Sequence, residues 1–344
     1  MVQRVLLILA VLLAALPAAA RTVTDSAGRT VEVPDSVGRV FAAGPPASVL
    51  VYVLKPEALL GWPRALRAEE RPYVAEPYRD LPETGRLTGR GGDANLELVL
   101  ALKPDVIVDF GSVRDTYVSL ADRVQAQTGI PYLLFDGRFE STAASLRAAG
   151  AALGVADRGE ALARDVEASF AGLDAALAEI PEAQRPRVYL ARGPDGLETG
   201  LKGSINTEII ERAGGRNVAD PGDGRRGLVQ ASLEQVIVAD PDTIVTWDRN
   251  FYRAVRADPL WAGIAAVRRG RVYLSPTAPF GWIDRPPSLN RLMGLKWLAG
   301  LFYPERFPSD LRTQVRTFYS TYYHVNLDGP AIDRLIEWAD GRTP

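Results

Sequence analysis

Two arginines and two tryptophans in the second half of the chain are of a type that could hold a small anionic ligand. Arg192 and Arg285 each offer a planar fork of N–H donors that suits carboxylate, phosphate-like or catecholate oxygens. Trp247 and Trp282 each offer a flat apolar face for a ring or a metal chelate. Each of the four follows a segment that reads as a buried strand, so we expect them at the ligand-binding edge of a parallel sheet. The competing roles are core packing for the tryptophans and surface ion pairs for the arginines.

The first half of the chain offers two further candidates of the same kind. Asp109 follows the apolar run 106–108, and Arg138 follows the apolar run 132–135. In open parallel sheets, ligands bind beyond the carboxyl ends of the strands. We therefore predict that Asp109 and Arg138 face the ligand from the other side of a cleft.

Catalytic and bare-metal chemistry find little support. The chain has one histidine, His324, two methionines and no cysteine, so a cluster of His and Cys metal ligands is not expected. Neither a Gly-x-Ser-x-Gly nucleophile motif nor a Walker-type phosphate loop is present. We predict a protein that is not an enzyme and has no cofactor, and any metal would arrive already held by a chelator.

The elements that position these residues follow from a pattern that occurs twice, 137 residues apart, at 95–108 and 232–245. Each copy predicts a helix capped by Asn95 or Ser232, a turn containing Pro-Asp, and a buried parallel strand. A chain that builds the same unit twice is expected to have two similar lobes. The predicted fold class is α/β, with two Rossmann-like lobes that contain parallel sheets and are joined by one long helix. Two such lobes enclose a cleft where small ligands bind.

Four segments make up the predicted organisation. Residues 1–20 carry Arg4, a continuous apolar run and an Ala-x-Ala site, which is typical of a cleaved signal peptide. The first lobe is expected over 21–156, the inter-lobe helix over 157–181 and the second lobe over 182–344. A chain without cysteine forms no disulfide and offers no attachment point for a lipid. We therefore expect a free protein of the periplasm rather than a lipoprotein.

Composition limits the partners. The 344 residues carry a formal net charge of -2, and 47% of them are hydrophobic. This charge gives no basic excess to neutralise phosphates, so nucleic acid is not an expected partner.

Several motifs together resemble a known family. The stretch 23–34, the two Leu-Glu and Pro-Asp repeats, the stretch 189–200 and the stretch 282–291 resemble the class III substrate-binding proteins of ABC importers, over essentially the whole mature chain. The resemblance implies a monomer that binds its ligand reversibly in the cleft, without chemistry, and delivers it to a permease and ATPase complex. It also implies docking through one exposed acid per lobe. Glu211 matches that position in the second lobe, whereas Leu50 stands at the usual place in the first, with Glu57 the nearest acid.

The predicted ligand is a ferric-siderophore-like metal chelate. Haem, cobalamin, or molybdate and tungstate remain open within the same class, because few loop residues separate these ligands. The alternatives from other classes are an exported two-lobed α/β hydrolase or lyase, and a sensor that presents its ligand-bound form to a receptor.

Overall fold

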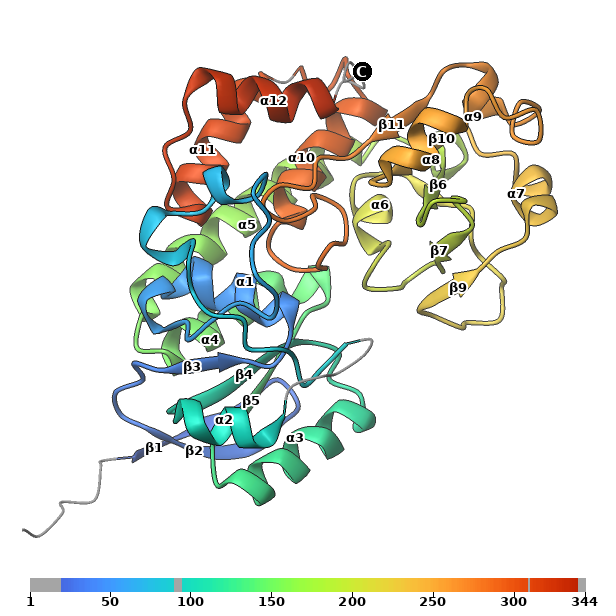
Figure 1. The fold of residues 1–344 in the computed structure, drawn as a ribbon. Coiled ribbons are helices and arrows are strands. Elements are labelled where there is room, and N and C mark those ends of the chain that lie inside the picture. The colour runs from blue at the N-terminus through green and yellow to red at the C-terminus, as the bar shows by residue number, and fades with distance from the viewer. Residues whose placement is uncertain (1–19, 90–94, 309, 340–344) are drawn as a thin grey trace, which may run out of the picture.

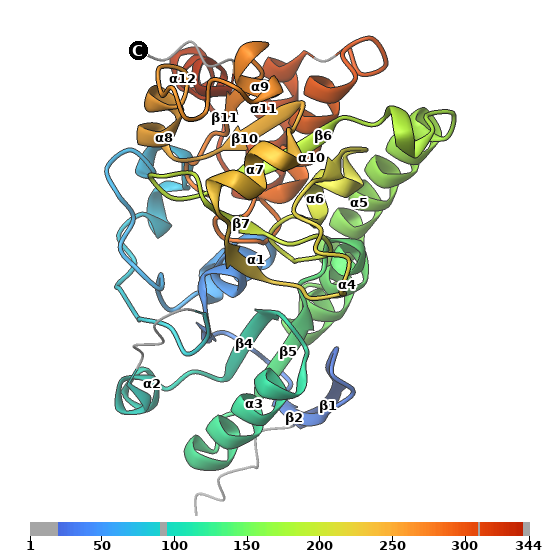
Figure 2. The same cartoon turned by 90° about the vertical axis from the view of Figure 1, so that its right-hand side faces the viewer.

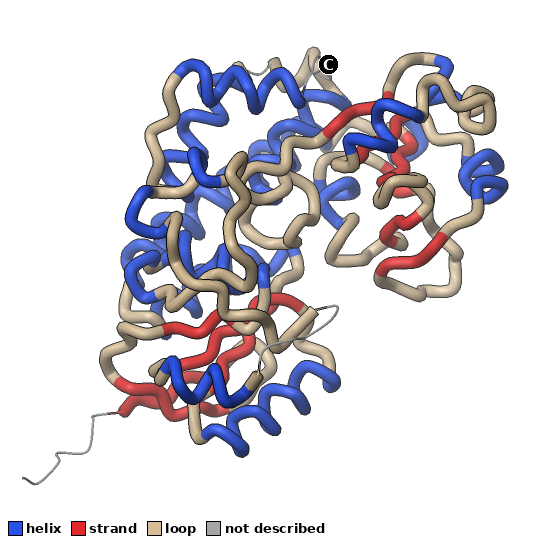
Figure 3. The backbone as a smooth tube through the Cα atoms, viewed as in Figure 1, coloured by secondary structure: helices blue, strands red, loops and turns tan. Residues whose placement is uncertain are grey.

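The computed structural model describes residues 20–89, 95–308 and 310–339. The predicted signal peptide lies outside the described residues except for Ala20. Two α/β lobes with parallel sheets, joined by a long helix, confirm the predicted fold class (Figure 1). The strands form two separate groups, with helices and loops between them (Figure 3).

The first lobe is built on a parallel sheet of order β3-β4-β5. Its strands are β3 (Val40–Ala42), β4 (Val106–Gly111) and β5 (Tyr132–Asp136). Helices α1 (Pro45–Leu54) and α4 (Thr142–Ala152) pack on one face, and α2 (Leu96–Leu102) and α3 (Asp115–Thr128) pack on the other. An antiparallel hairpin of β1 (Ala20–Thr24) and β2 (Thr30–Pro34) precedes the sheet. Both faces of the sheet are covered, which is why its strands are continuous apolar runs.

The second lobe repeats this plan with shorter elements. Its parallel sheet has the order β11-β10-β6-β8, formed by β6 (Arg187–Ala191), β8 (Arg216–Asn217), β10 (Thr243–Thr246) and β11 (Val272–Leu274). A separate antiparallel ribbon consists of β7 (Glu198–Gly200) and β9 (Leu228–Gln230). The helices of this lobe are α6 (Glu208–Arg212), α7 (Leu233–Ala239), α8 (Arg249–Ala254) and α9 (Ala265–Arg268).

The sequence repeat is also a structural repeat. Asn95 caps α2 by accepting from the Glu97 N–H, and Ser232 forms a full capping box with Gln235 at α7. Each helix ends at a residue in the left-handed region, Lys103 at φ 45° and Asp240 at φ 34°. Those two residues are again 137 positions apart. The sequence therefore predicted both the existence of these units and how their helices begin.

Helix α5 (Ala156–Leu177) joins the lobes and runs beside both (Figure 2). It lies tightly against α4, because a Cβ atom on Gly159 would lie 2.6 Å from the Leu146 carbonyl oxygen. Only a glycine permits this crossing. The inter-lobe helix was predicted over 157–181 and instead ends at Leu177. Helix α1 ends at Leu54, because Pro56 cannot continue a helix.

The three C-terminal helices connect the lobes a second time. They are α10 (Arg291–Phe302), α11 (Leu311–Tyr323) and α12 (Gly329–Ala339). Although the prediction counted 182–344 as one lobe, α11 lies against α1 of the first lobe. The Tyr52 hydroxyl donates to the Tyr323 carbonyl, and the Tyr73 hydroxyl donates to the Ala331 carbonyl at 3.2 Å. The two lobes are thus held together by packed side chains as well as by α5.

Five single 3-10 turns complete the described secondary structure. They are Pro56–Ala58, Arg71–Tyr73, Glu76–Tyr78, Phe139–Ser141 and Glu182–Gln184. The first three of them lie in the long loop that follows α1 and brings first-half residues to the second lobe.

Candidate anion-binding cleft

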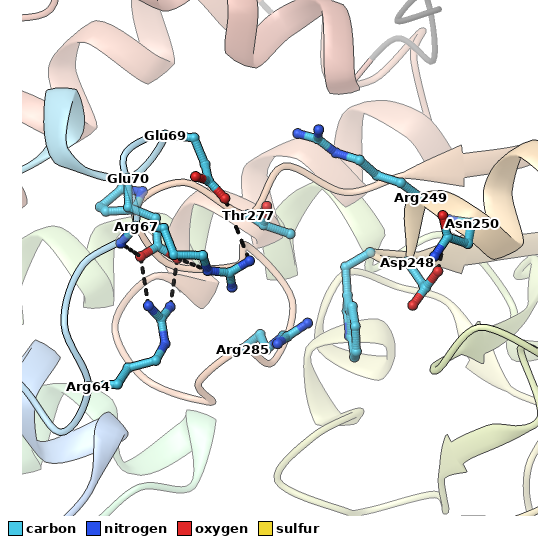
Figure 4. Close-up of a pocket in the computed structure, with 11 residues that line it drawn as sticks. Arg64, Arg67, Glu69, Glu70, Asp248, Arg249, Asn250, Thr277 and Arg285 are labelled. Atoms are coloured by element: carbon cyan, nitrogen blue, oxygen red, sulfur yellow. Dashed lines mark hydrogen bonds and ion pairs between the residues drawn. The ribbon is translucent and has the colours of Figure 1, made fainter. Parts of the chain in front are cut away.

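A small polar cavity lies between the loop that follows α1 and the loops at the carboxyl edge of the second sheet. Its volume is about 230 Å³. Four arginines line it: Arg64 and Arg67 from the first half of the chain, and Arg249 and Arg285 from the second. Three carboxylates also line it, those of Glu69, Glu70 and Asp248. The lining therefore has one positive charge in excess. In Figure 4, Arg285 lies between Arg64 and Arg67 on one side and Asp248 and Arg249 on the other.

Arg285 is the guanidinium best placed to meet a ligand. Its Cζ atom lies 4.3 Å from the centre of the Trp247 ring, over the indole face. None of the described residues forms a hydrogen bond or an ion pair with its guanidinium. The pKa of Arg285 is lowered by partial burial and then by the positive charges of Arg67 and Arg64. Arginine nevertheless keeps its charge in proteins, so an anion here would relieve repulsion as well as gain hydrogen bonds.

Arg192 lies close by, but carboxylates neutralise its charge. Its Nε atom lies 3.0 Å from Asp284 Oδ2, and its Nη1 atom lies 3.2 Å from Glu198 Oε1. Asp284 is buried, and its Oδ1 atom accepts from Trp247 Nε1 at 3.0 Å. Arg192 therefore supports the wall of the cleft beneath Trp247 instead of offering a free donor fork.

The two first-half arginines share one acceptor. Arg64 donates to both carboxylate oxygens of Glu70, at 2.6 and 2.8 Å, and this pairing raises the pKa of Arg64. Arg67 Nε lies 3.3 Å from Glu70 Oε1. Glu70 is almost fully buried, so it holds both arginines at the cavity as a fixed counter-ion. Arg67 Nη1 also lies 3.6 Å from Glu69 Oε1, so two carboxylates match the two arginines on this side, and the excess positive charge of the lining lies on the other side of the cavity.

The structure thus brings together three of the six predicted ligand-binding residues, namely Arg192, Trp247 and Arg285. Trp282 lies elsewhere: it is fully buried in the core, its Nε1 atom is 3.2 Å from the Tyr319 hydroxyl, and its backbone lies directly against Gly294 of α10. The prediction of a ligand contact for Trp282 is therefore corrected to core packing, which was the competing role.

Asp109 and Arg138 do not line the cavity either. Arg138 is exposed at the end of β5 and pairs with Asp136, with Nη2 and Oδ2 2.6 Å apart. Asp109 is buried inside the first lobe, where its Oδ1 accepts from the Thr88 hydroxyl at 3.2 Å and the Phe110 N–H at 2.9 Å. Its Oδ2 faces the Tyr132 hydroxyl at 3.4 Å. Arg138 follows β5, as predicted, whereas Asp109 lies inside β4, which extends to Gly111. The side chains of both residues have protein partners.

The burial of Asp109 is expected to make the stability of the protein depend on pH. Burial raises the pKa of this carboxyl from 3.8 to about 6, although the hydrogen bonds from Thr88, Phe110 and Tyr132 oppose the shift. Between those two pH values the folded protein binds a proton that the unfolded chain has released, so the free energy of unfolding falls as the pH rises. A shift of about two units corresponds to about 3 kcal/mol.

Replacing the acid tests this assignment. Asp109→Asn retains the acceptor for Thr88 and Phe110 and offers an N–H to Tyr132, but it cannot ionise. We expect the stability of the variant relative to wild type to increase by about 3 kcal/mol between pH 4 and pH 7. Urea unfolding at several pH values measures this difference. Parallel pH profiles for the two proteins would contradict it.

The two predicted docking acids differ in their exposure. Leu50 is fully buried in α1, and Glu57 is exposed on the turn after it. Glu211 is half-buried, and its Oε1 atom is buried without a hydrogen-bond partner among the described residues. Burial also raises the pKa of Glu211. A partly buried carboxylate is poorly placed to meet an arginine of another protein.

Sequence reasoning missed the loop residues Arg64, Arg67 and Glu70, as well as the role of Asp284. The segment 64–70 lies in a loop rich in charge, Pro and Gly. Its two arginines followed by two glutamates were the available sign of an ion-pair cluster.

Neither a cluster of metal ligands nor a membrane-spanning helix is found among the described residues. They contain no group of three or more His, Cys, Asp and Glu side chains that could hold a metal ion. None of their helices is long and apolar enough to cross a membrane.

A two-lobed α/β fold with an arginine-lined cavity between the lobes is typical of a solute-binding protein, and comparison with known proteins identifies the family. The chain belongs to the periplasmic binding protein family, whose profile matches residues 62–279. Members bind solutes for ABC transporters and are not enzymes, as predicted.

Several relatives are similar over most of the chain. The molybdate-binding protein MolA of Haemophilus influenzae is 28% identical over 337 residues, which cover 89% of this chain and 92% of that protein. The vitamin B12-binding protein of Salmonella typhi is 29% identical over 188 residues, covering 53% of this chain and 66% of that one. Among solved structures, an ABC transporter solute-binding protein from Sulfurospirillum deleyianum superposes with a TM-score of 0.83. It is 30% identical, with 92% of this chain and 99% of the other covered.

Proposed function

We propose that this protein captures a small oxyanion of the molybdate and tungstate class and delivers it to the permease of an ABC importer. The observation that carries the proposal is the guanidinium of Arg285, which lies in the cleft on Trp247 without a partner among the described residues. An oxyanion offers several acceptor oxygens to such a donor fork and to the neighbouring arginines. The similarity to a molybdate-binding protein over most of the chain supports the same ligand class.

The size and lining of the cavity favour the oxyanion over the larger ligands. Its volume of about 230 Å³ is below the roughly 300–1,000 Å³ of sites for drug-sized molecules. Ferric siderophores, haem and cobalamin are all larger than this cavity. No tyrosine or histidine of the described residues lines this cavity, so an axial ligand for haem is missing there. The ferric-chelate ligand preferred from sequence is therefore replaced here by the oxyanion alternative.

A titration panel tests the ligand class. We expect saturable quenching of tryptophan fluorescence by molybdate or tungstate, and weaker binding at higher salt because charge attraction is screened. The panel includes sulfate, phosphate, a ferric hydroxamate, a ferric catecholate, haemin and cobalamin. Trp247→Phe should abolish most of the quenching, whereas calorimetry reports binding independently of fluorescence. Binding of only haemin, cobalamin or a ferric chelate would overturn the proposal.

For docking on the permease, the structural repeat favours a different pair of acids from the one predicted. Glu97 and Glu234 stand at equivalent positions, 137 residues apart, in the first turns of α2 and α7, and both are exposed. Beside them, Leu100 and Ile237 are also equivalent, and each is 46% exposed. Each lobe therefore presents one acid and one apolar side chain in the same arrangement, which suits a permease that meets both lobes in the same way.

Charge removal on these helices tests the docking assignment. We expect the double variant Glu97→Gln, Glu234→Gln to bind molybdate as wild type does. Its stimulation of ATP hydrolysis by the cognate importer in proteoliposomes should fall about tenfold, because rim charges guide association. The matched control is Glu57→Gln with Glu211→Gln. Loss of stimulation in the control pair alone would return docking to the acids predicted from sequence.

A further inference from the structure

Asp284 lies directly before Arg285 in the loop between β11 and α10, yet the two side chains have opposite surroundings. Arg285 is exposed to the cleft, whereas Asp284 is only 2% exposed. A buried carboxylate is costly unless charges and hydrogen bonds surround it. The partners of Asp284 therefore indicate what this acid does in the fold.

Two hydrogen-bond donors and one guanidinium group, from three different loops, meet the Asp284 carboxylate. Its Oδ1 accepts from Trp247 Nε1 at 3.0 Å, and its Oδ2 accepts from Asn206 Nδ2 at 3.1 Å. Arg192 Nε lies 3.0 Å from the same Oδ2 atom. Trp247 follows β10, Arg192 follows β6, and Asn206 precedes α6. One side chain thus ties together the loops that form the second-lobe wall of the cleft.

This arrangement determines the surroundings of Arg285 in two ways. The hydrogen bond to Nε1 fixes the plane of the Trp247 indole, and Arg285 rests on that plane with its Cζ atom 4.3 Å from the ring centre. Meanwhile, the negative charge of Asp284 is matched by Arg192, so it does not neutralise Arg285, its neighbour in sequence. Both carboxylate oxygens have protein donors, so Asp284 itself need not touch a ligand.

We propose that Asp284 is the positioning residue of the cleft: it orients Trp247 and pairs with Arg192, so that Arg285 alone is left free for an anion. The ligand part of this inference rests on the proposed function. The orientation of Trp247 does not, because it is a property of the ligand-free protein.

The first measurement therefore needs no ligand. In a ¹⁵N–¹H spectrum of the full mature chain, the indole peak of Trp247 is assigned by its disappearance in Trp247→Phe. Asp284→Ala removes both acceptor oxygens, so the hydrogen bond from Trp247 Nε1 cannot persist. We expect the Trp247 indole peak to shift and its hydrogen exchange with water to accelerate at least about tenfold, as for a lost buried hydrogen bond. An unchanged peak and exchange rate would overturn the proposal.

The second measurement uses molybdate as the probe, read by calorimetry at matched folded fraction. Asp284→Ala and Trp247→Phe should each weaken molybdate binding about tenfold, and the double variant should be little weaker than either, since both remove the same contact. A purely structural role would lower stability but leave the affinity of the folded molecules unchanged. Full additivity of the two losses would also contradict the inference.

If wild type binds no molybdate, the proposed function fails while the indole measurement still decides the role of Asp284. If Asp284→Ala does not fold, Asn206→Ala removes one donor and tests the same cluster.

Discussion

Replacing Arg285 with alanine is expected to weaken molybdate binding about 10- to 100-fold, the loss typical of one or two hydrogen bonds to a charged group. Arg285 is the cleft arginine that has no partner among the described residues, so its removal leaves no other guanidinium free to take its place. Arg64 and Arg67 remain, but both are held by Glu70. Isothermal titration calorimetry at low and moderate salt measures the change.

Two variants separate charge, geometry and distance in this experiment. Arg285→Lys keeps the positive charge but loses the planar fork, so its affinity should lie between wild type and alanine. Arg138→Ala removes an arginine that pairs with Asp136 outside the cavity, and it should bind as wild type does. The slope of affinity against ionic strength should decrease in Arg285→Ala and remain unchanged in Arg138→Ala. Equal losses in both alanine variants would show that net charge, rather than this cleft, attracts the anion.

The parts of the site that could be predicted are those fixed by local rules. Capping residues and the Pro-Asp turns occur twice in the sequence, so the two αβ units and their strand ends followed directly. The rule that ligands bind beyond strand ends then selected Arg192, Trp247 and Arg285, and all three meet at one edge of the second sheet.

The parts that could not be predicted depend on long-range packing. Trp282 belongs to the same loop as Arg285, but its backbone lies so close to α10 that a Cβ atom on Gly294 would be 1.9 Å from the Trp282 carbonyl oxygen. Nothing in the local sequence distinguishes this buried tryptophan from Trp247. The contribution of Arg64 and Arg67 is equally non-local, because the loop after α1 reaches the second lobe only in the folded chain.

For the same reason, the sequence did not indicate the role of Arg291, the first residue of α10. This residue is fully buried at the junction of the lobes. Its guanidinium donates to the Gly137 carbonyl of the first lobe at 2.7 Å. It also donates to Glu208 Oε1 of the second lobe at 2.7 Å. Glu208 Oε1 in turn accepts from the Phe139 N–H at 2.6 Å. Burial lowers the pKa of Arg291, and Glu208 opposes that shift. One buried ion pair therefore connects the second lobe to the loop that follows β5.

Breaking this pair is expected to destabilise the whole protein. Arg291→Met fills a similar volume but removes the positive partner of the Glu208 carboxylate and the donor to the Gly137 carbonyl, which should cost about 3–5 kcal/mol. Urea unfolding followed by circular dichroism measures the loss. The double variant Arg291→Met, Glu208→Gln removes the uncompensated charge, so it should recover part of the stability. Arg147→Met breaks a solvent-exposed ion pair with Glu160 and should change stability little by comparison. If Arg291→Met and Arg147→Met were equally mild, the lobes would be held together by α5 and the C-terminal helices alone. The buried pair would then have no measurable part in fixing the cleft.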